Sequence, residues 1–327
     1  MGTECSGLES VMAALDRMAL GRRAKLRFIC EKDPACRKII LGHRSPDAVY
    51  DDITLRPVTG MPTCDLYAAG FPCQPWSAAG LGQGEQDKHG RGRIFGHILD
   101  YLCHKTPKCY ILENVKGIAT STHRAAFHEM LTALRAGGRY LVSWRVLNTA
   151  DYGLPQNRPR VYIIGVLRSA VAAGAPCFKW PPPDLACQPL AALPEAGPVH
   201  RAQPTKNTTA ARNLEKLASS LARQGVDTSS TPYVLDIFAS KGRSIAGKVP
   251  CLTRTRAGSG GYWVTSVAGL LTTREMLRLQ GLPERLIDTA RTVGVTDRQL
   301  RQMIGNAMSV NLLVVVLNTL LRAVGVT

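Results

Sequence analysis

Short apolar runs alternate with amphipathic segments along the first half of the chain. The apolar runs lie at residues 26–30, 65–69, 109–112 and 161–166, and helical spacing of apolar positions marks residues 8–20 and 94–103. Strands that alternate with helices predict a parallel, doubly wound sheet. The helical period returns in residues 275–280, 297–303 and 310–324. The two stretches are therefore predicted to form one α/β body.

A segment of different composition separates these stretches. It begins with an Ala- and Pro-rich part that contains Pro181-Pro182-Pro183, and its remainder is polar and basic. Residues 166–268 carry 12 basic and 5 acidic side chains. We therefore predict a main domain made of residues 1–166 and 269–327, with a small domain inserted at residues 167–268.

Charge and cysteine usage narrow the function classes. The 327 residues carry 41 Lys and Arg against 24 Asp and Glu, a net charge of +17, which favours a polyanionic partner. None of the ten cysteines forms a C-x-x-C pair, so no metal site is predicted and the thiols are expected to be reduced. The apolar stretch at residues 312–317 ends at Asn318, and no signal segment opens the chain. We therefore expect an intracellular protein without a membrane span.

The most prominent motif follows the apolar run at residues 65–69. It reads Gly70-Phe71-Pro72-Cys73-Gln74-Pro75-Trp76-Ser77. In a doubly wound sheet this loop lies at the carboxyl ends of the strands, where ligands bind. Pro72 and Pro75 restrict the backbone on both sides of Cys73. The thiol is therefore either a rigidly presented nucleophile or a packed small hydrophobic group.

Two further segments place polar groups beside apolar strands. Glu113 ends the run at residues 110–112, where it is a proton carrier, a helix N-cap or a surface acid. Arg158 and Arg160 precede another strand, and alternate residues of an extended segment share a face. Two guanidinium groups on one face can bind a base oxygen, a carboxylate or phosphate, or form a solvated basic edge.

Together these blocks resemble the cytosine-C5 DNA methyltransferase family. Residues 70–77, Glu113-Asn114-Val115 and Gln156-Asn157-Arg158-Pro159-Arg160 occur in the family's order, and residues 271–283 and 305–311 agree with its C-terminal blocks. The basic insert also lies where the family has its target-recognition domain. Several blocks in the correct order, over nearly the whole chain, are far more specific than any one of them. The resemblance implies a Rossmann-like, S-adenosylmethionine-dependent methyltransferase fold.

The resemblance also assigns catalytic roles. Cys73 would attack C6 of a cytosine and so make C5 nucleophilic toward the methyl group of S-adenosylmethionine. Glu113 would hold the N3 and N4 edge of the base. Arg160 would bind the base carbonyl, with Arg158 close by. A base inside a duplex cannot reach Cys73, so the target must be flipped out.

The implied cofactor site comes from several short segments. Its residues are Cys5, Ser6 and Gly7 for the methionine end, Glu31 for the ribose, Asp52 and Ile53 for the adenine, and Pro72, Asn306 and Ser309 to complete the pocket. One departure affects this site, because the family usually has further glycines where this chain has Leu8 and Glu9. The Glu9 side chain would either narrow the pocket or hydrogen-bond the cofactor's ammonium group.

The implied DNA contacts lie in the cysteine loop and the insert. They are Gln74 and Ser77 for the displaced strand, Lys241, Arg243 and Lys248 for phosphates, and Thr253, Arg254 and Arg256 for base edges. A hairpin with solvated arginines is the alternative for the last group.

The substrate is expected to be double-stranded DNA. Pro75-Trp76-Ser77 resembles the DNA-acting members of the family, while a tRNA cytosine-C5 methyltransferase and a catalytically silent DNA-binding homologue remain alternatives. One flipped base for each active site makes a monomer sufficient. The location is expected to be the nucleus in a eukaryote, with an organelle or the bacterial cytoplasm also open.

Overall fold

The computed structural model describes residues 1–72, 94–174, 176–183, 186–195 and 199–326. The chain divides into two compact units. The first contains Met1–Leu147, Pro159–Pro182 and Leu312–Thr327, and the second contains Asn148–Arg158 and Pro183–Asn311. Each unit has its own sheet and its own hydrophobic core.

A seven-stranded sheet, counted over the described residues, forms the centre of the first unit. Its spatial order is β3 (Ala48–Tyr50), β2 (Phe28–Cys30), β1 (Gly2–Glu4), β4 (Leu66–Gly70), β5 (Cys109–Val115), β8 (Pro159–Leu167) and β6 (Tyr140–Asn148). The strands from β3 to β5 pair in parallel, and β8 pairs antiparallel to β5. The predicted α/β fold with a mostly parallel sheet is confirmed.

The strand order determines where this sheet can bind a ligand. From β1 the chain proceeds through β2 to β3 on one side, and then returns to place β4 and β5 on the other side. The order therefore reverses between β1 and β4. In open α/β sheets, ligands bind at the carboxyl ends of the strands beside such a reversal. For this unit, that edge follows Glu4 at the end of β1 and Gly70 at the end of β4.

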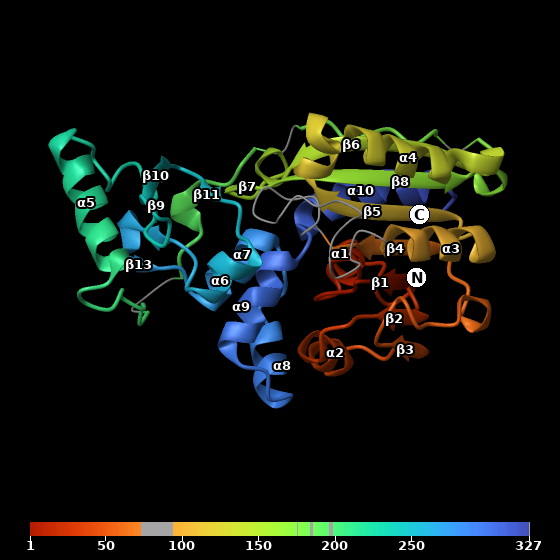
Figure 1. The fold of residues 1–327 in the computed structure, drawn as a ribbon, viewed down its shortest axis with the longest axis horizontal. Helices are drawn as coiled ribbons and strands as arrows, with labels where there is room; N and C mark the ends of the chain where they lie inside the picture. Colours follow the sequence, from red (N-terminus) through yellow and green to blue (C-terminus); the bar gives the residue numbers. More distant parts are fainter. Residues whose placement is uncertain (73–93, 175, 184–185, 196–198, 327) are drawn as a thin grey trace. The chain divides into compact units, whose positions relative to one another are not determined.

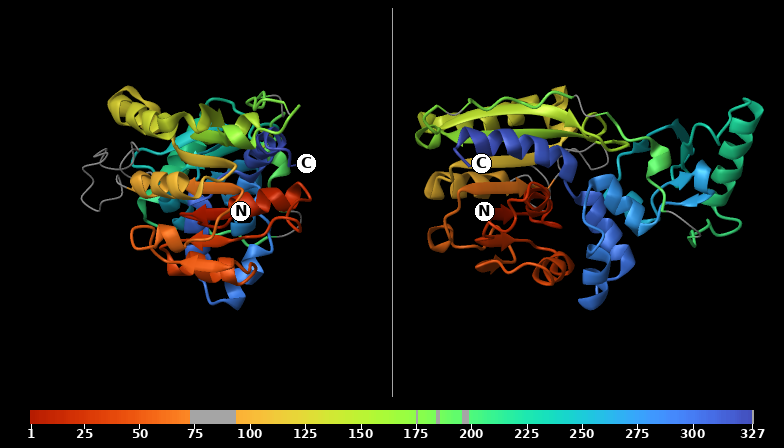
Figure 2. Two further views of the ribbon diagram at one scale, coloured as in Figure 1. Left: turned by 90° about the vertical axis from the view of Figure 1, so that its right-hand side faces the viewer. Right: turned by 180° about the vertical axis from the view of Figure 1, so that it is seen from behind.

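Helices cover both faces of the sheet. The unit's helices are α1 (Ser10–Arg17), α2 (Pro34–Leu41), α3 (Ile94–Lys105), α4 (Arg124–Arg135) and α10 (Val310–Ala323). Helices α3 and α4 lie on one face, and α1 and α10 lie on the other (Figures 1 and 2). Apolar residues of α3 and α4 join a core that includes Tyr67, Tyr101 and Tyr110, each fully buried. The sheet edge therefore rests on a rigid, well-packed support.

The second unit combines short strands with five helices in its described part. A four-stranded sheet has the order β10 (Arg243–Ala246), β9 (Tyr233–Asp236), β12 (Trp263–Val264) and β13 (Gly269–Leu270), and β7 (Gln156–Asn157) pairs with β11 (Val249–Pro250). The helices are α5 (Thr209–Arg223), α6 (Arg254–Gly258), α7 (Thr273–Gln280), α8 (Leu286–Thr292) and α9 (Asp297–Asn306). Capping boxes at Thr272 and Thr296 start α7 and α9, because each threonine and the side chain three residues later satisfy exposed backbone N–H groups.

The boundaries of the two units differ from the domain boundaries expected at residues 167 and 268. Residues 269–311 belong to the second unit because α9 packs closely against α6. A Cβ atom at Gly305 on α9 would approach the carbonyl oxygen of Thr253 to 2.4 Å, so only glycine allows this approach. The functional division into a catalytic and a target-recognition domain stays a prediction.

No single helix among the described residues is long and apolar enough to cross a membrane. Within the described part of the chain, α9 and α10 reach that length and hydropathy when they are taken together.

Candidate active site

The candidate active site begins where β4 and β5 end. Strand register places Gly70 directly beside Glu113. The chain continues from Gly70 through Phe71 and Pro72 toward Cys73, which lies outside the described residues together with Gln74 and Ser77. The Asn114 side-chain amide donates a hydrogen bond to the carbonyl oxygen of Phe71 at 3.4 Å. The segment that leads to Cys73 is therefore tied to the strand that carries Glu113.

Arg160 lies at the same edge. Strand β8 runs antiparallel to β5 and pairs Val115 with Arg160. The Nε atom of Arg160 is 3.2 Å from the Oε1 atom of Glu113, and the two side chains are 13% and 9% exposed. A carboxylate and a guanidinium group so placed can accept from and donate to the polar edge of a pyrimidine. The structure thus brings together two of the four residues predicted to be catalytic.

Arg158 has different surroundings, contrary to the expectation that it shares a face with Arg160. It is 2% exposed within the second unit, where it donates to the carbonyl oxygens of Leu252, Gly305 and Ala307 at 2.7–3.3 Å. The expectation fails because the extended chain is interrupted at this residue, between β7 and β8. Strand alternation cannot be extended across such a break.

The predicted methionine-binding turn follows β1 in a left-handed conformation. Cys5 and Gly7 have φ values of 50° and 57°. The Gly7 N–H donates to Oε2 of Glu31 at 2.8 Å, and the Asp33 N–H donates to Oε1 at 2.9 Å. Burial raises the pKa of Glu31, and these two N–H groups oppose the rise. Each carboxylate oxygen has a second lone pair, so Glu31 can still accept bonds from ribose hydroxyls.

Glu9 closes this turn and caps α1. It is 1% exposed and has a left-handed φ of 56°. The Thr3 hydroxyl donates to its Oε1 atom at 2.5 Å, whereas its Oε2 atom has no hydrogen-bond partner among the described residues. Burial raises the pKa of Glu9 to about 7, against the hydrogen bond from Thr3 and the charge of Arg44. Glu9 is therefore a buried acid that titrates near neutrality.

The other predicted cofactor residues divide between the two units. Asp52 forms an ion pair of 2.8 Å with Lys32, and this hydrogen bond lowers the pKa of Asp52 to about 2. Ile53 beside it is buried. In the second unit, Asn306 is exposed at the end of α9. Ser309 is buried, and its hydroxyl is 2.6 Å from that of Thr149.

The predicted DNA contacts other than Gln74 and Ser77 lie in the second unit. Lys241, Arg243 and Lys248 are exposed around β10, every residue of which is exposed. Thr253 and Arg254 are exposed at the start of α6, where the Thr253 hydroxyl accepts from the backbone N–H of Arg256.

Arg256 is instead engaged with its own unit. It is 3.1 Å from Asp236, and its guanidinium carbon lies 5.8 and 5.9 Å from the ring centres of Phe238 and Tyr262.

Comparison with known proteins agrees with this geometry. The sequence model of the C-5 cytosine-specific DNA methylase family matches residues 5–322. The chain belongs to this family. Among curated members, it is 34% identical over 265 residues to the Type II methyltransferase M.NgoBI of Neisseria gonorrhoeae, covering 80% of this chain and 75% of that protein. It is also 34% identical over 267 residues to M.HaeII of Haemophilus aegyptius, with the same two shares. The resemblance inferred from the motifs is confirmed.

Solved structures of methyltransferases share the fold of this C-5 cytosine-specific methylase. Dnmt2 of S. pombe aligns with a TM-score of 0.61 at 18% identity, over 98% of this chain and 96% of that one. The Entamoeba histolytica methyltransferase EhMeth aligns with a TM-score of 0.64 at 14% identity, over 98% and 97%. These likenesses establish the methyltransferase fold.

A buried charge cluster in this methylase escaped prediction from the sequence. Arg56 binds Glu4 through both Nε and Nη2, and the Tyr67 hydroxyl donates to the same carboxylate. Glu4 ends a strand as short as three residues, and Arg56 follows the predicted adenine turn at Ile53. The one available signal was a charge at the end of this short strand, which does not identify its partner.

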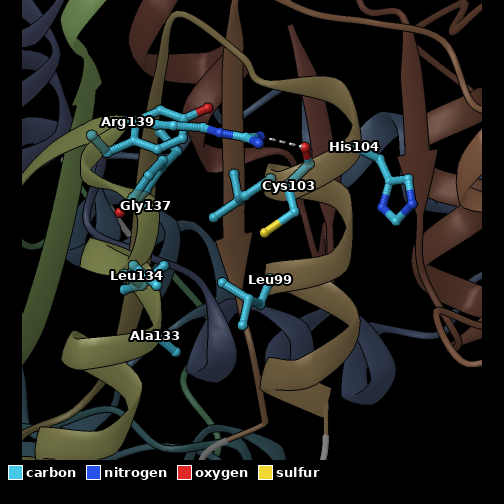
Figure 3. A pocket seen from close by; sticks show the side chains of 11 residues that line it. Leu99, Cys103, His104, Ala133, Leu134, Gly137 and Arg139 are labelled. Carbon is cyan, nitrogen blue, oxygen red and sulfur yellow. Dashed lines mark hydrogen bonds between the residues drawn. The ribbon is translucent and has the colours of Figure 1, made fainter.

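A cavity of about 290 Å³ lies elsewhere in the first unit (Figure 3). Leu99, Cys103 and Leu134 line it, and Arg139 donates to the carbonyl oxygen of Cys103 at 3.1 Å. Tyr110, near the amino end of β5, also lines it, whereas Glu113 lies toward the carboxyl end. The cavity is therefore separate from the candidate active site. Over the described part of the chain, no group of three or more His, Cys, Asp or Glu side chains could hold a metal ion.

Proposed function

We propose that this chain transfers a methyl group from S-adenosylmethionine to C5 of a flipped-out cytosine in double-stranded DNA. The observation that carries the proposal is the Glu113–Arg160 pair beside Gly70, three residues before Cys73. Family membership supports the reaction class. The names of the Type II methyltransferase relatives support a DNA substrate.

In the proposed reaction, the Cys73 thiolate forms a bond to C6 of the cytosine. Glu113 holds the N3 and N4 edge of the ring, and Arg160 donates to the base carbonyl, so both stabilise charge that develops on the ring. S-adenosylmethionine, when bound, supplies the methyl group that C5 takes up. Loss of the C5 proton and cleavage of the C6–sulfur bond then restore the ring and the thiolate.

The proposal gives Arg158 a supporting role. Its guanidinium group is occupied by the carbonyl oxygens of Leu252, Gly305 and Ala307. A buried guanidinium that satisfies several carbonyl groups holds the backbone around it in place. We therefore propose that Arg158 braces the second unit, while Arg160 contacts the base.

The proposed cofactor residues are those implied by the family resemblance. In the first unit these are Cys5, Ser6, Gly7, Glu31, Asp52, Ile53 and Pro72, and in the second they are Asn306 and Ser309. Two features of the turn fit the methionine end. A Cβ atom at Gly7 would meet nothing within 4 Å, so the space above the turn is open. The Oε2 atom of Glu9 is buried without a hydrogen-bond partner among the described residues, and an ammonium group that reached it would be its donor.

The proposed DNA contacts keep the roles predicted from the sequence, except for Arg256. Lys241, Arg243 and Lys248 would bind phosphates, and Thr253 and Arg254 would contact base edges. Arg256 would support the Arg254 segment, because its guanidinium group is paired with Asp236. Gln74 and Ser77 would contact the strand that the flipped base leaves.

Transfer of labelled methyl groups from S-adenosylmethionine to mixed DNA, with total tRNA in parallel, tests the proposal. We expect 5-methylcytosine in DNA and no label in tRNA. The Cys73→Ser variant should lose turnover and keep DNA binding, because the hydroxyl is a far weaker nucleophile. Label in tRNA alone would favour the tRNA alternative. Label in neither substrate, with DNA still bound, would favour a silent DNA-binding homologue.

A further inference from the structure

A buried ion pair joins the two turns that are proposed to bind the cofactor. Glu4 is the last residue of β1 and directly precedes the turn Cys5–Gly7. Arg56 follows Asp52 and Ile53, and its backbone N–H donates to the carbonyl oxygen of Asp52 at 3.2 Å. The side chains of Glu4 and Arg56 are 0% and 1% exposed. One guanidinium group therefore connects both segments out of contact with water.

The pair is held from several directions. Both oxygens of the Glu4 carboxylate accept bonds from Arg56, with Nη2 at 3.1 Å from Oε2, and Tyr67 on β4 donates a further bond. Arg56 Nη2 also donates to the carbonyl oxygen of His97 on α3 at 2.6 Å. Burial raises the pKa of Glu4, and the hydrogen bond from Arg56 opposes that rise. The guanidinium group of Arg56 therefore has a fixed orientation relative to β1, β4 and α3.

Stability alone does not account for such a pair. Replacing a buried ion pair by apolar side chains of similar volume is often neutral or stabilising, because removing two charges from water is costly. What a bidentate Arg–carboxylate pair adds is a fixed relative orientation of the two side chains. The turn beside it needs such support, because Cys5 has a left-handed φ of 50° and a side chain that disfavours this conformation.

We propose that Arg56, through Glu4, is a positioning residue that aligns the turn Cys5–Gly7 with the turn Asp52–Ile53 for S-adenosylmethionine. The inference rests on the proposed function, because it concerns the cofactor of that reaction. Arg56 acts through the backbone of the two turns.

Calorimetric titration with S-adenosylmethionine and with its demethylated product tests the inference. We expect Arg56→Met to bind both compounds about 10-fold more weakly, because the two turns lose their common anchor. In steady state, the KM for S-adenosylmethionine should rise more than kcat falls, and the KM for DNA should stay unchanged. A loss of kcat with an unchanged KM would overturn the inference.

A second variant separates positioning from folding. Arg56→Met alone leaves the Glu4 carboxylate buried without its partner, which destabilises the unit. The double variant Glu4→Leu with Arg56→Met restores an apolar, packed pair and should recover most of the melting temperature. We expect the double variant still to bind the cofactor about 5-fold more weakly than the wild type, because apolar packing does not fix the relative orientation of the two turns as the ion pair does. A double variant that binds as tightly as the wild type would overturn the inference.

The second unit offers a matched control. Arg201 and Glu275 form a similarly buried pair, 2.6 Å apart with side chains 8% and 0% exposed. Arg201→Met should lower the melting temperature and leave cofactor affinity within about twofold of the wild type. Equal loss of affinity in Arg201→Met and Arg56→Met would overturn the inference. A wild-type chain that binds neither compound would overturn the proposed function as well, whereas normal binding by Arg56→Met would overturn the inference alone.

Discussion

The proposed catalytic edge of the first unit, formed by Glu113 and Arg160, differs from the basic surface of the second unit, formed by residues around α6 and β10, in how its charges are held. At the catalytic edge, Glu113 and Arg160 lie on neighbouring strands, and the register of those strands brings them within 3.2 Å. Around α6 and β10, Lys248 is exposed, while Arg256 has turned to Asp236. Backbone pairing therefore determines which groups meet at the first site. At the second, the protein itself can pair with a basic side chain, as Asp236 does with Arg256.

The largest expected effect breaks the catalytic edge. Glu113→Gln keeps the size of the side chain and removes its charge, so it should lower the rate of methyl transfer by about 10²- to 10⁴-fold. DNA binding and the circular dichroism spectrum should be unchanged. Single-turnover transfer to DNA at saturating S-adenosylmethionine is the measurement.

Glu284→Gln is the matched control for Glu113→Gln. Glu284 also pairs with arginines, Arg274 and Arg278, but in the second unit. Its loss should leave the transfer rate within about twofold of the wild type. If Glu113→Gln retained more than about a tenth of the wild-type rate, Glu113 would matter no more for methyl transfer than other arginine-paired carboxylates do.

The same difference explains what could be predicted from the sequence. The strands near residues 26–30, 65–69, 109–112 and 161–166 follow from apolar runs. The approach of Glu113 to Gly70 agrees with the rule that the strand ends of a parallel sheet share one edge. The environment of Arg158 could not be predicted, because its partners are carbonyl oxygens 94 to 149 residues away. The Glu4–Arg56 pair was missed for a related reason, since a short strand does not reveal what its last side chain faces.

The second-largest effect concerns Glu9, the buried acid that precedes α1 in the first unit. The pKa of Glu9 is raised by burial from 4.5 to about 7, so the folded chain binds a proton more tightly than the unfolded chain. The contribution of Glu9 to stability is therefore fully present below pH 4.5 and is lost as the pH rises through about 7. Glu9→Gln removes this loss and should raise the free energy of unfolding at pH 8 by about 3 kcal/mol.

Chemical denaturation at pH 5 and at pH 8 measures the effect of Glu9→Gln. The gain should be much smaller at pH 5, where Glu9 is largely protonated in the folded chain. Glu129→Gln, an exposed acid on α4, serves as the control and should show no such dependence on pH. Equal gains at both pH values would mean that the charge of Glu9 is not the cause.

The third effect distinguishes the two kinds of basic residue in the second unit. Arg256→Ala removes an ion pair with Asp236 and contacts with the rings of Phe238 and Tyr262. It should lower the free energy of unfolding by about 2 kcal/mol. Arg254→Ala, at an exposed position, should leave stability unchanged and alter sequence preference in methylation. If the two variants changed stability equally, the structural role assigned to Arg256 would be wrong.

The smallest effect concerns Lys248, which is exposed beside β11. Lys248→Ala should weaken DNA binding several-fold for all sequences, and it should reduce the slope of log K against log salt by about one. Lys38→Ala on α2 changes the net charge equally but lies outside the predicted DNA contacts, so its slope should match that of the wild type. Fluorescence anisotropy with two unrelated duplexes, over a series of salt concentrations, provides both slopes.

If Lys38→Ala and Lys248→Ala shifted the slope equally, DNA would respond to the net charge of +17 rather than to a defined surface. A change in Lys248→Ala alone, equal for both duplexes, would show that this part of the second unit contacts phosphate without reading sequence.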